Sequence, residues 1–116
     1  MNKENKLIPG LPSGFEDRWG KKLTLKKKLI NIIETNFVKF GFAALETPSF
    51  EISENIGSFL ADDDSNPMSD VFSFKDGEKN ITLRYDLSSP LARFVAQNNQ
   101  ELPLPYKRYQ MGDVWR

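Results

Sequence analysis

The sequence predicts an α+β fold in which an antiparallel sheet is flanked by helices. One long segment has apolar residues at helical spacing, several short runs have the composition of strands, and the connections between these runs are short. Short connections favour antiparallel pairing, because a parallel pair needs a crossover of about a dozen residues or more. A chain of 116 residues is enough for one domain with one modest core.

The first twenty residues are expected to form an extended arm. Closely spaced breakers interrupt this stretch and end regular elements, at Pro9, Gly10, Pro12, Gly14 and Gly20. We therefore divide the chain into an arm over residues 1–20 and a core region over residues 21–116.

Residues 24–41 have the pattern of an amphipathic helix. Gly41 is typical of the position that follows a helix end. Burying the six apolar side chains of the helix would contribute roughly 9 to 18 kcal/mol before the entropy cost. This apolar face therefore needs a substantial partner surface, and it consists of Leu25, Leu29, Ile32, Ile33, Phe37 and Phe40.

Strand-like runs follow this helix. Residues 42–46 have strand composition, and Pro48 marks an edge or an end because proline cannot donate to a sheet ladder. The acidic, turn-rich stretch 59–70 is expected to be a surface loop. Residues 71–74 and 81–86 read as two strands, joined by a segment whose Asp-Gly pair favours a hairpin turn.

A second helix and a last strand are expected after the hairpin. Ser88 or Ser89 can cap a helix that has Pro90 in its first turn. Residues 106–116 alternate as a strand does, with Gly112 at a bulge. No return strand follows, and an unpaired sheet edge favours aggregation, so we expect the chain to be the front part of a longer domain.

The composition excludes several kinds of function. Lys plus Arg number 16 and Asp plus Glu number 16, so the chain has no overall positive charge that would indicate nucleic-acid binding. The chain has no His and no Cys, which excludes a histidine-based triad and a thiolate or imidazole zinc site within it. Chemistry must rest on carboxylates, Arg, Lys and hydroxyls. No apolar run approaches the length of a membrane span and no signal peptide is visible, so we expect a cytoplasmic protein.

The stretch "LRYDLSSPLARF", residues 83–94, has a carboxylate at the junction between a predicted strand and a predicted helix. Two roles are possible for Asp86 at this junction. It can cap the following helix, because a carboxylate accepts hydrogen bonds from the free N–H groups of a helix start. It can also bind a ligand amine, because a charge-assisted hydrogen bond to an ammonium is stronger than a neutral one. Arg84 is read as a structural residue that makes an ion pair or orients Asp86.

Several stretches together resemble the class II aminoacyl-tRNA synthetases, and most closely the histidyl-tRNA synthetases. "LPSGFEDR" is similar to the amino-terminal signature of that family, and residues 24–51 are similar to its motif 1. "VFSFKD" with "LRYDLSSPLAR" resembles the segment characteristic of the histidine enzymes, and "VWR" resembles the first half of motif 2. The resemblance implies an incomplete class II catalytic domain that ends in motif 2.

The resemblance also implies roles for three residues. In the family, the acidic residue that corresponds to Asp86 receives the α-ammonium of the amino acid, and the hydroxyl residue that corresponds to Ser88 helps to hold the same end. The motif 2 arginine, matched by Arg116, grips the α-phosphate of ATP and acts in catalysis. A guanidinium suits this role because it is always charged and planar. We expect Asp86 and Arg116 to face one shared cavity.

The implied reaction is attack of the histidine carboxylate on the α-phosphorus of ATP, with Mg²⁺ on the phosphates. It gives a histidyl-adenylate and then charged histidine tRNA. A carboxylate is already a nucleophile, so no general base is needed. Motif 1 implies a homodimer formed through the helix and strand. Motif 3, the histidine-recognition loops and the anticodon-binding domain are absent, so we expect the 116 residues alone to be inactive.

Other readings stay open. The regulatory subunit of the short-form ATP phosphoribosyltransferase is a synthetase-like protein that binds histidine without charging tRNA. A small interaction module would use the apolar helix face to bind a partner. Taken singly, Arg116 is a surface arginine, and Tyr106, Tyr109 and Trp115 are packing residues rather than a stacking platform. The Lys-rich helix surface is solvated or lies near tRNA.

Overall fold

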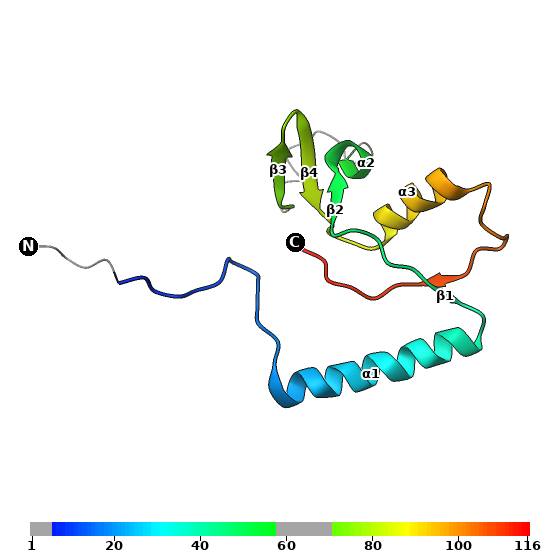
Figure 1. The fold of residues 1–116 in the computed structure, drawn as a ribbon, viewed down its shortest axis with the longest axis horizontal. Helices are drawn as coiled ribbons and strands as arrows, with labels where there is room; N and C mark the ends of the chain where they lie inside the picture. Colours follow the sequence, from blue (N-terminus) through cyan, green and yellow to red (C-terminus); the bar gives the residue numbers. More distant parts are fainter. Residues whose placement is uncertain (1–5, 58–70) are drawn as a thin grey trace, which may run out of the picture.

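The computed structural model describes residues 6–57 and 71–116, and Figure 1 shows their arrangement. Residues 6–19 contain no helix or strand and lead into a long helix. A three-stranded sheet and two shorter helices lie on the other side of the molecule, with the carboxy-terminal segment between them and the long helix (Figure 1). The elements are α1 Gly20–Lys39, β1 Ala43–Ala44, β2 Phe50–Ile52, α2 Ser53–Gly57, β3 Ser73–Asp76, β4 Lys79–Leu83, α3 Ser88–Asn98 and β5 Arg108–Tyr109.

The three-stranded sheet is antiparallel, with the order β2-β4-β3. Its hairpin β3–β4 confirms the predicted turn, and Gly77 there has a positive φ of 63° that glycine adopts without strain. The second strand pair, β1 with β5, is parallel, with Ala43 opposite Arg108. The expectation of antiparallel pairing is wrong for this pair. The strands are far apart in sequence, so the intervening chain forms the long connection that parallel pairing requires.

Helix α1 ends as its sequence predicts, but it begins at Gly20 rather than at residue 24. Gly41 follows the helix with φ 83°. The N–H of Gly41 donates to the carbonyl of Val38 at 3.1 Å, and the N–H of Phe42 donates to the carbonyl of Phe37 at 3.0 Å. This is the hydrogen-bond pattern of a Schellman motif, and the rings of Phe37 and Phe42 make its usual apolar contact at 5.4 Å.

The apolar face expected to be buried on α1 is exposed in the chain as described. Its six side chains keep between 36% and 73% of their surface open: Leu25, Leu29, Ile32, Ile33, Phe37 and Phe40. The helix instead contacts the rest of the chain through a stacked pair, Phe37 on Tyr109 of β5, with ring centroids 5.3 Å apart. The burial energy assigned to this face is therefore not realised within the described residues, and the face remains available for another surface.

The buried part of the chain lies where α2 and α3 meet the three-stranded sheet. Ile56, Thr82 and Pro90 are its largest fully buried side chains. A buried ion pair joins β2 to α3, because Glu51 accepts two hydrogen bonds from Arg93, at 2.8 and 3.0 Å. Strand β2 follows Pro48 and was not predicted, since Pro48 was read as the end of strand structure.

The carboxy-terminal segment is extended but is strand only at Arg108–Tyr109, shorter than the predicted strand over residues 106–116. Gly112 lies outside the strands, so the predicted bulge is wrong. The predicted surface loop 59–70 lies outside the described residues. Within residues 6–57 and 71–116, no helix combines the length and the apolar character that crossing a membrane requires.

Candidate functional site

The junction between β4 and α3 holds the predicted acidic residue. Asp86 Oδ1 accepts the backbone N–H of Ser89 at 3.0 Å, and Oδ2 accepts the Ser89 hydroxyl at 3.4 Å. Asp86 therefore caps α3, which begins at Ser88. The expectation that Ser88 or Ser89 would be the cap is wrong, because Asp86, two and three residues earlier, supplies the acceptor.

Capping leaves part of the Asp86 carboxylate available. A carboxylate has about four lone-pair sites, and the two recorded hydrogen bonds use one on each oxygen. The side chain is half-buried, which strengthens any further charge-assisted hydrogen bond. Ser88 is exposed at the first position of α3. Capping and binding of a cationic group are thus compatible at this junction.

Arg116 lies beside this junction. Its Nε donates to the backbone carbonyl of Tyr85 at 3.0 Å, and the N–H of Trp115 donates to the carbonyl of Arg84 at 3.0 Å. The carboxy-terminal segment therefore runs along residues 84–85, next to Asp86. The Arg116 side chain is exposed, and its recorded hydrogen bond uses Nε alone.

Arg108 also reaches the junction, and sequence reasoning did not select it. Its Nη2 donates to the carbonyl of Leu87 at 3.2 Å from strand β5. The carbonyls on either side of Asp86, those of Tyr85 and Leu87, thus accept hydrogen bonds from Arg116 and Arg108. The only sequence signal was its alternation with neighbouring residues in "YKRYQ", which does not reveal what the side chain approaches.

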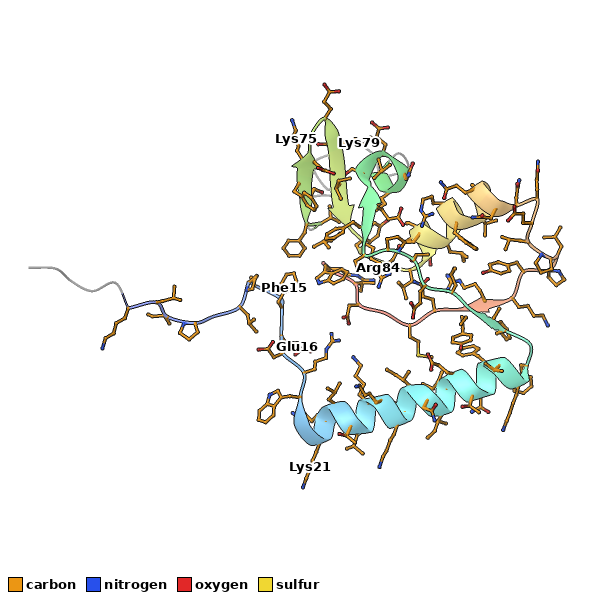
Figure 2. The ribbon with its side chains drawn as sticks, viewed as in Figure 1. Phe15, Glu16, Lys21, Lys75, Lys79 and Arg84 are labelled. Atoms are coloured by element: carbon orange, nitrogen blue, oxygen red, sulfur yellow. The ribbon has the colours of Figure 1, made fainter. Side chains whose placement is uncertain are left out.

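Arg84 is buried directly after the end of β4, as its predicted structural role requires, but it does not make the predicted ion pair. Its Nε donates to the carbonyl of Asp113 at 2.8 Å, and its Nη1 donates to the carbonyl of Thr47 at 2.9 Å. These acceptors are peptide carbonyls, not carboxylates. Figure 2 labels Arg84 near the centre of the molecule, where β4, the segment before β2 and the carboxy-terminal segment meet.

A surface hollow of about 650 Å³ lies between the arm and the carboxy-terminal segment, and residues 14–18 and 113–115 line it. Arg18 bridges the two sides through Nη1, which lies 2.7 Å from Oδ1 of Asp113. The Arg18 hydrogen bond and charge lower the pKa of Asp113, against the opposing effect of burial, and Asp113 in turn raises the pKa of Arg18. Asp86 and Arg116 do not line this hollow, so it is not the shared cavity that the sequence predicts.

The described residues contain no cluster of three or more carboxylates that could hold a metal ion by themselves. The junction itself presents the carboxylate of Asp86 with Arg108 and Arg116 beside it. Such a site can hold a ligand that carries both a cationic and an anionic group.

Comparison with known proteins gives relatives in sequence and in structure. No family model matches the chain. The chain is 97% identical over 116 residues to a histidine–tRNA ligase of Pelagibacter ubique, and this match covers 100% of the chain and 25% of that protein. It is 43% identical over 115 residues to the histidine–tRNA ligase of Rhodopseudomonas palustris, covering 98% of the chain and 22% of that protein. The chain thus spans about a quarter of the length of the curated relatives it matches.

A solved structure agrees with these sequence matches. The histidyl-tRNA synthetase of a Nostoc species superposes with a TM-score of 0.78 at 27% sequence identity. The superposition covers 92% of this chain and 25% of that one. The α+β fold described above is therefore that of the corresponding part of this solved structure.

Proposed function

Because the chain has the sequence and the fold of part of a class II histidyl-tRNA synthetase catalytic domain, we propose that the protein containing it ligates histidine to histidine tRNA. The 97% identity over the whole chain carries this proposal. The first step is attack of the histidine carboxylate on the α-phosphorus of ATP, which breaks the bond to pyrophosphate and forms histidyl-adenylate. In the second step a ribose hydroxyl of the tRNA displaces AMP. The proposal includes a cytoplasmic location for this reaction.

Asp86 and Ser88 are proposed to hold the amino end of histidine. The unused lone pairs of the Asp86 carboxylate suit an α-ammonium group, and half-burial at the junction strengthens such a contact. Ser88 is exposed at the first position of α3, two residues after Asp86, and can add a hydroxyl contact. The α3 cap keeps the carboxylate oriented, because both its oxygens already contact Ser89.

Arg116 is proposed to bind the α-phosphate and to act in catalysis. Its Nε contact with Tyr85 fixes the guanidinium plane beside the junction. The terminal Nη groups can then face a phosphate, where their charge offsets the negative charge that builds up on phosphorus in the transition state. A carboxylate nucleophile needs no general base, so positioning and electrostatics are sufficient.

Mg²⁺ is part of the proposal as the partner of the ATP phosphates. When bound, it lowers the repulsion between the triphosphate and the incoming carboxylate. The donor set at the junction fits an ion held chiefly by phosphate oxygens, since Asp86 is its single carboxylate and already caps α3.

The apolar face of α1 is proposed to form a homodimer contact, together with the strand that follows the helix. Its six side chains are 36% to 73% exposed, and a hollow of about 300 Å³ lies at its carboxy-terminal end, lined by Ile33, Asn36, Phe37, Phe40 and Phe42. A contiguous apolar surface of this kind marks an interaction site. Light scattering on the full-length protein tests this part, with a dimer expected and a monomer counting against it.

Histidine-dependent exchange of pyrophosphate into ATP tests the function itself. Asp86→Asn should raise the KM for histidine more than the KM for ATP. Arg116→Gln should lower kcat by about 100-fold to 1,000-fold, as the loss of one transition-state donor does. Asp76→Asn is the matched control, because this exposed carboxylate ends β3 beside Lys75, and Figure 2 shows Lys75 and Lys79 at the end of the hairpin away from Arg84. Histidine binding without exchange or tRNA charging would instead support a regulatory histidine-binding protein.

A further inference from the structure

Arg84 carries a charge into the interior of the chain, where 7% of its surface is exposed. A buried cation is costly unless hydrogen bonds satisfy it. In the part of the chain that the structure describes, no ion pair involves Arg84, so its hydrogen bonds to carbonyl groups must offset this cost. A buried guanidinium with neutral acceptors calls for a functional explanation.

The contacts of Arg84 join three segments that are far apart in sequence. Nη1 donates to the carbonyl of Thr47 at 2.9 Å and approaches its hydroxyl at 3.4 Å. Nε donates to the carbonyl of Asp113 at 2.8 Å, and the guanidinium lies 5.9 Å from the ring centroid of Trp115. The backbone adds two contacts, since the N–H of Arg84 donates to Ser49 and its carbonyl accepts from Trp115.

The guanidinium of Arg84 occupies space that is open because residue 112 is a glycine without a side chain. A Cβ at this position would lie 2.6 Å from Nη2 of Arg84. That separation is too short for a non-bonded contact, so any side chain at residue 112 would displace the guanidinium or the carboxy-terminal segment. The sequence therefore places a glycine against the one buried arginine of the described residues.

We propose that Arg84 is a positioning residue that sets Asp86 and Arg116 at a fixed separation. This inference rests on the proposed function, in which Asp86 holds the amino acid and Arg116 holds ATP. Asp86 follows Arg84 by two residues in the segment between β4 and α3. Arg116 lies three residues after Asp113, whose carbonyl accepts a hydrogen bond from Arg84. One guanidinium thereby fixes both binding groups, although it touches neither substrate.

The planar fork of arginine is essential to this role. Its two recorded donors, Nε and Nη1, point to carbonyls of different segments at the same time. A lysine ammonium is a point charge on a flexible stem and cannot reproduce that geometry. Arg84→Lys therefore keeps the positive charge but no longer fixes the separation between Asp86 and Arg116.

The test is pyrophosphate exchange by the full-length protein, with KM measured separately for histidine and for ATP. Arg84→Lys should lower kcat/KM by about 100-fold, the size expected when reacting groups are misplaced by about 1 Å. The KM values for both substrates should rise together. Gly112→Ala, which crowds the guanidinium without removing it, should show the same paired effect and decides the matter if Arg84→Lys does not fold.

Thr82→Val is the matched control, because Thr82 lies on β4 two residues before Arg84, is fully buried and is hydrogen-bonded, but contacts Ser53 and Ser73 rather than the site. It should lower stability without raising both KM values. An Arg84→Lys or Gly112→Ala protein that folds and shows unchanged KM values, or a rise for one substrate alone, overturns the positioning role. Absence of exchange in the unaltered protein overturns the proposed function, and the positioning role with it.

Discussion

The ion pair between Glu51 and Arg93 gives the sharpest prediction about stability. Glu51 lies on β2 with 5% of its side chain exposed, and Arg93 lies on α3 with 21% exposed. Both carboxylate oxygens accept from the guanidinium, at 2.8 and 3.0 Å, and Arg93 Nη1 also donates to Gln97 at 2.8 Å. We predict that Glu51→Gln weakens the packing of α3 on the three-stranded sheet.

The magnitude follows from what the substitution leaves behind. Glutamine keeps one oxygen acceptor but turns an NH₂ group toward the second guanidinium nitrogen, so one hydrogen bond is lost and the charge of the half-buried Arg93 is no longer balanced. Breaking a buried ion pair at one partner costs about 3 to 5 kcal/mol, and the partial exposure of Arg93 places the cost near the lower end, at about 3 kcal/mol.

Hydrogen exchange of the full-length protein measures this cost locally. A loss of about 3 kcal/mol corresponds to a decrease of about 100-fold in the protection of the amides of α3, since each 1.4 kcal/mol is about tenfold. Glu54→Gln is the control, because Glu54 is exposed on α2 and the same chemical change there should leave protection unaltered. Equal protection in the two variants would refute the assignment of Glu51–Arg93 as the contact that holds α3.

Three further outcomes are expected. Thr82→Val removes the hydroxyl that joins Ser53 and Ser73 and should cost about 1 to 3 kcal/mol in denaturant unfolding, whereas no loss would show that the hydroxyl cluster does not stabilise the sheet. Gly41→Ala should lower the free energy of unfolding by about 1 to 2 kcal/mol, because residue 41 has a φ of 83° although an added Cβ would meet nothing within 4 Å. Gly10→Ala should leave stability unchanged, because Gly10 is equally open but has no positive φ. Arg18→Gln should raise the pKa of Asp113 toward its ordinary 3.8, as followed by carboxyl NMR. Because Arg18 lowers the folded-state pKa, its contact stabilises the arm fully above pH 3.8 and is lost as the pH falls through the lowered value; an unchanged pKa in the variant would contradict this.

Local patterns predicted the elements whose cause is local. The Schellman end of α1 needs only Gly41 and its near neighbours, and the β3–β4 hairpin needs only its turn, so both were readable from the sequence. The parallel pairing of β1 with β5 depends on chain segments far apart in sequence, which no local signal encodes. Strand β2 was missed for a related reason, because its pairing with β4 overrides the boundary suggested by Pro48.

The residues of the candidate site also divide into those with local contacts, which the sequence reveals, and those with distant partners, which it does not. Asp86 was found because a carboxylate at a strand–helix junction is visible in a short stretch, and its capping contact spans three residues. The contacts of Arg18 and Arg108 span 95 and 21 residues, so their partners could not be inferred from spacing. Arg84 was recognised as structural, but its carbonyl acceptors replaced the expected carboxylate because the segments around Thr47 and Asp113 converge on it.

The choice of acceptors around Asp86 has a consequence for ligand binding. Arg108 and Arg116 hydrogen-bond to the backbone carbonyls of Leu87 and Tyr85, and within residues 6–57 and 71–116 none of the ion pairs joins an arginine to Asp86. Had one of them paired with Asp86, its charge and that of the carboxylate would cancel, and a ligand would have to break that pair. Carbonyl acceptors hold the guanidinium groups of Arg108 and Arg116 in place without neutralising their charge. The junction therefore keeps positive and negative groups side by side, which is the arrangement that the proposed reaction of an amino acid with a nucleotide phosphate requires.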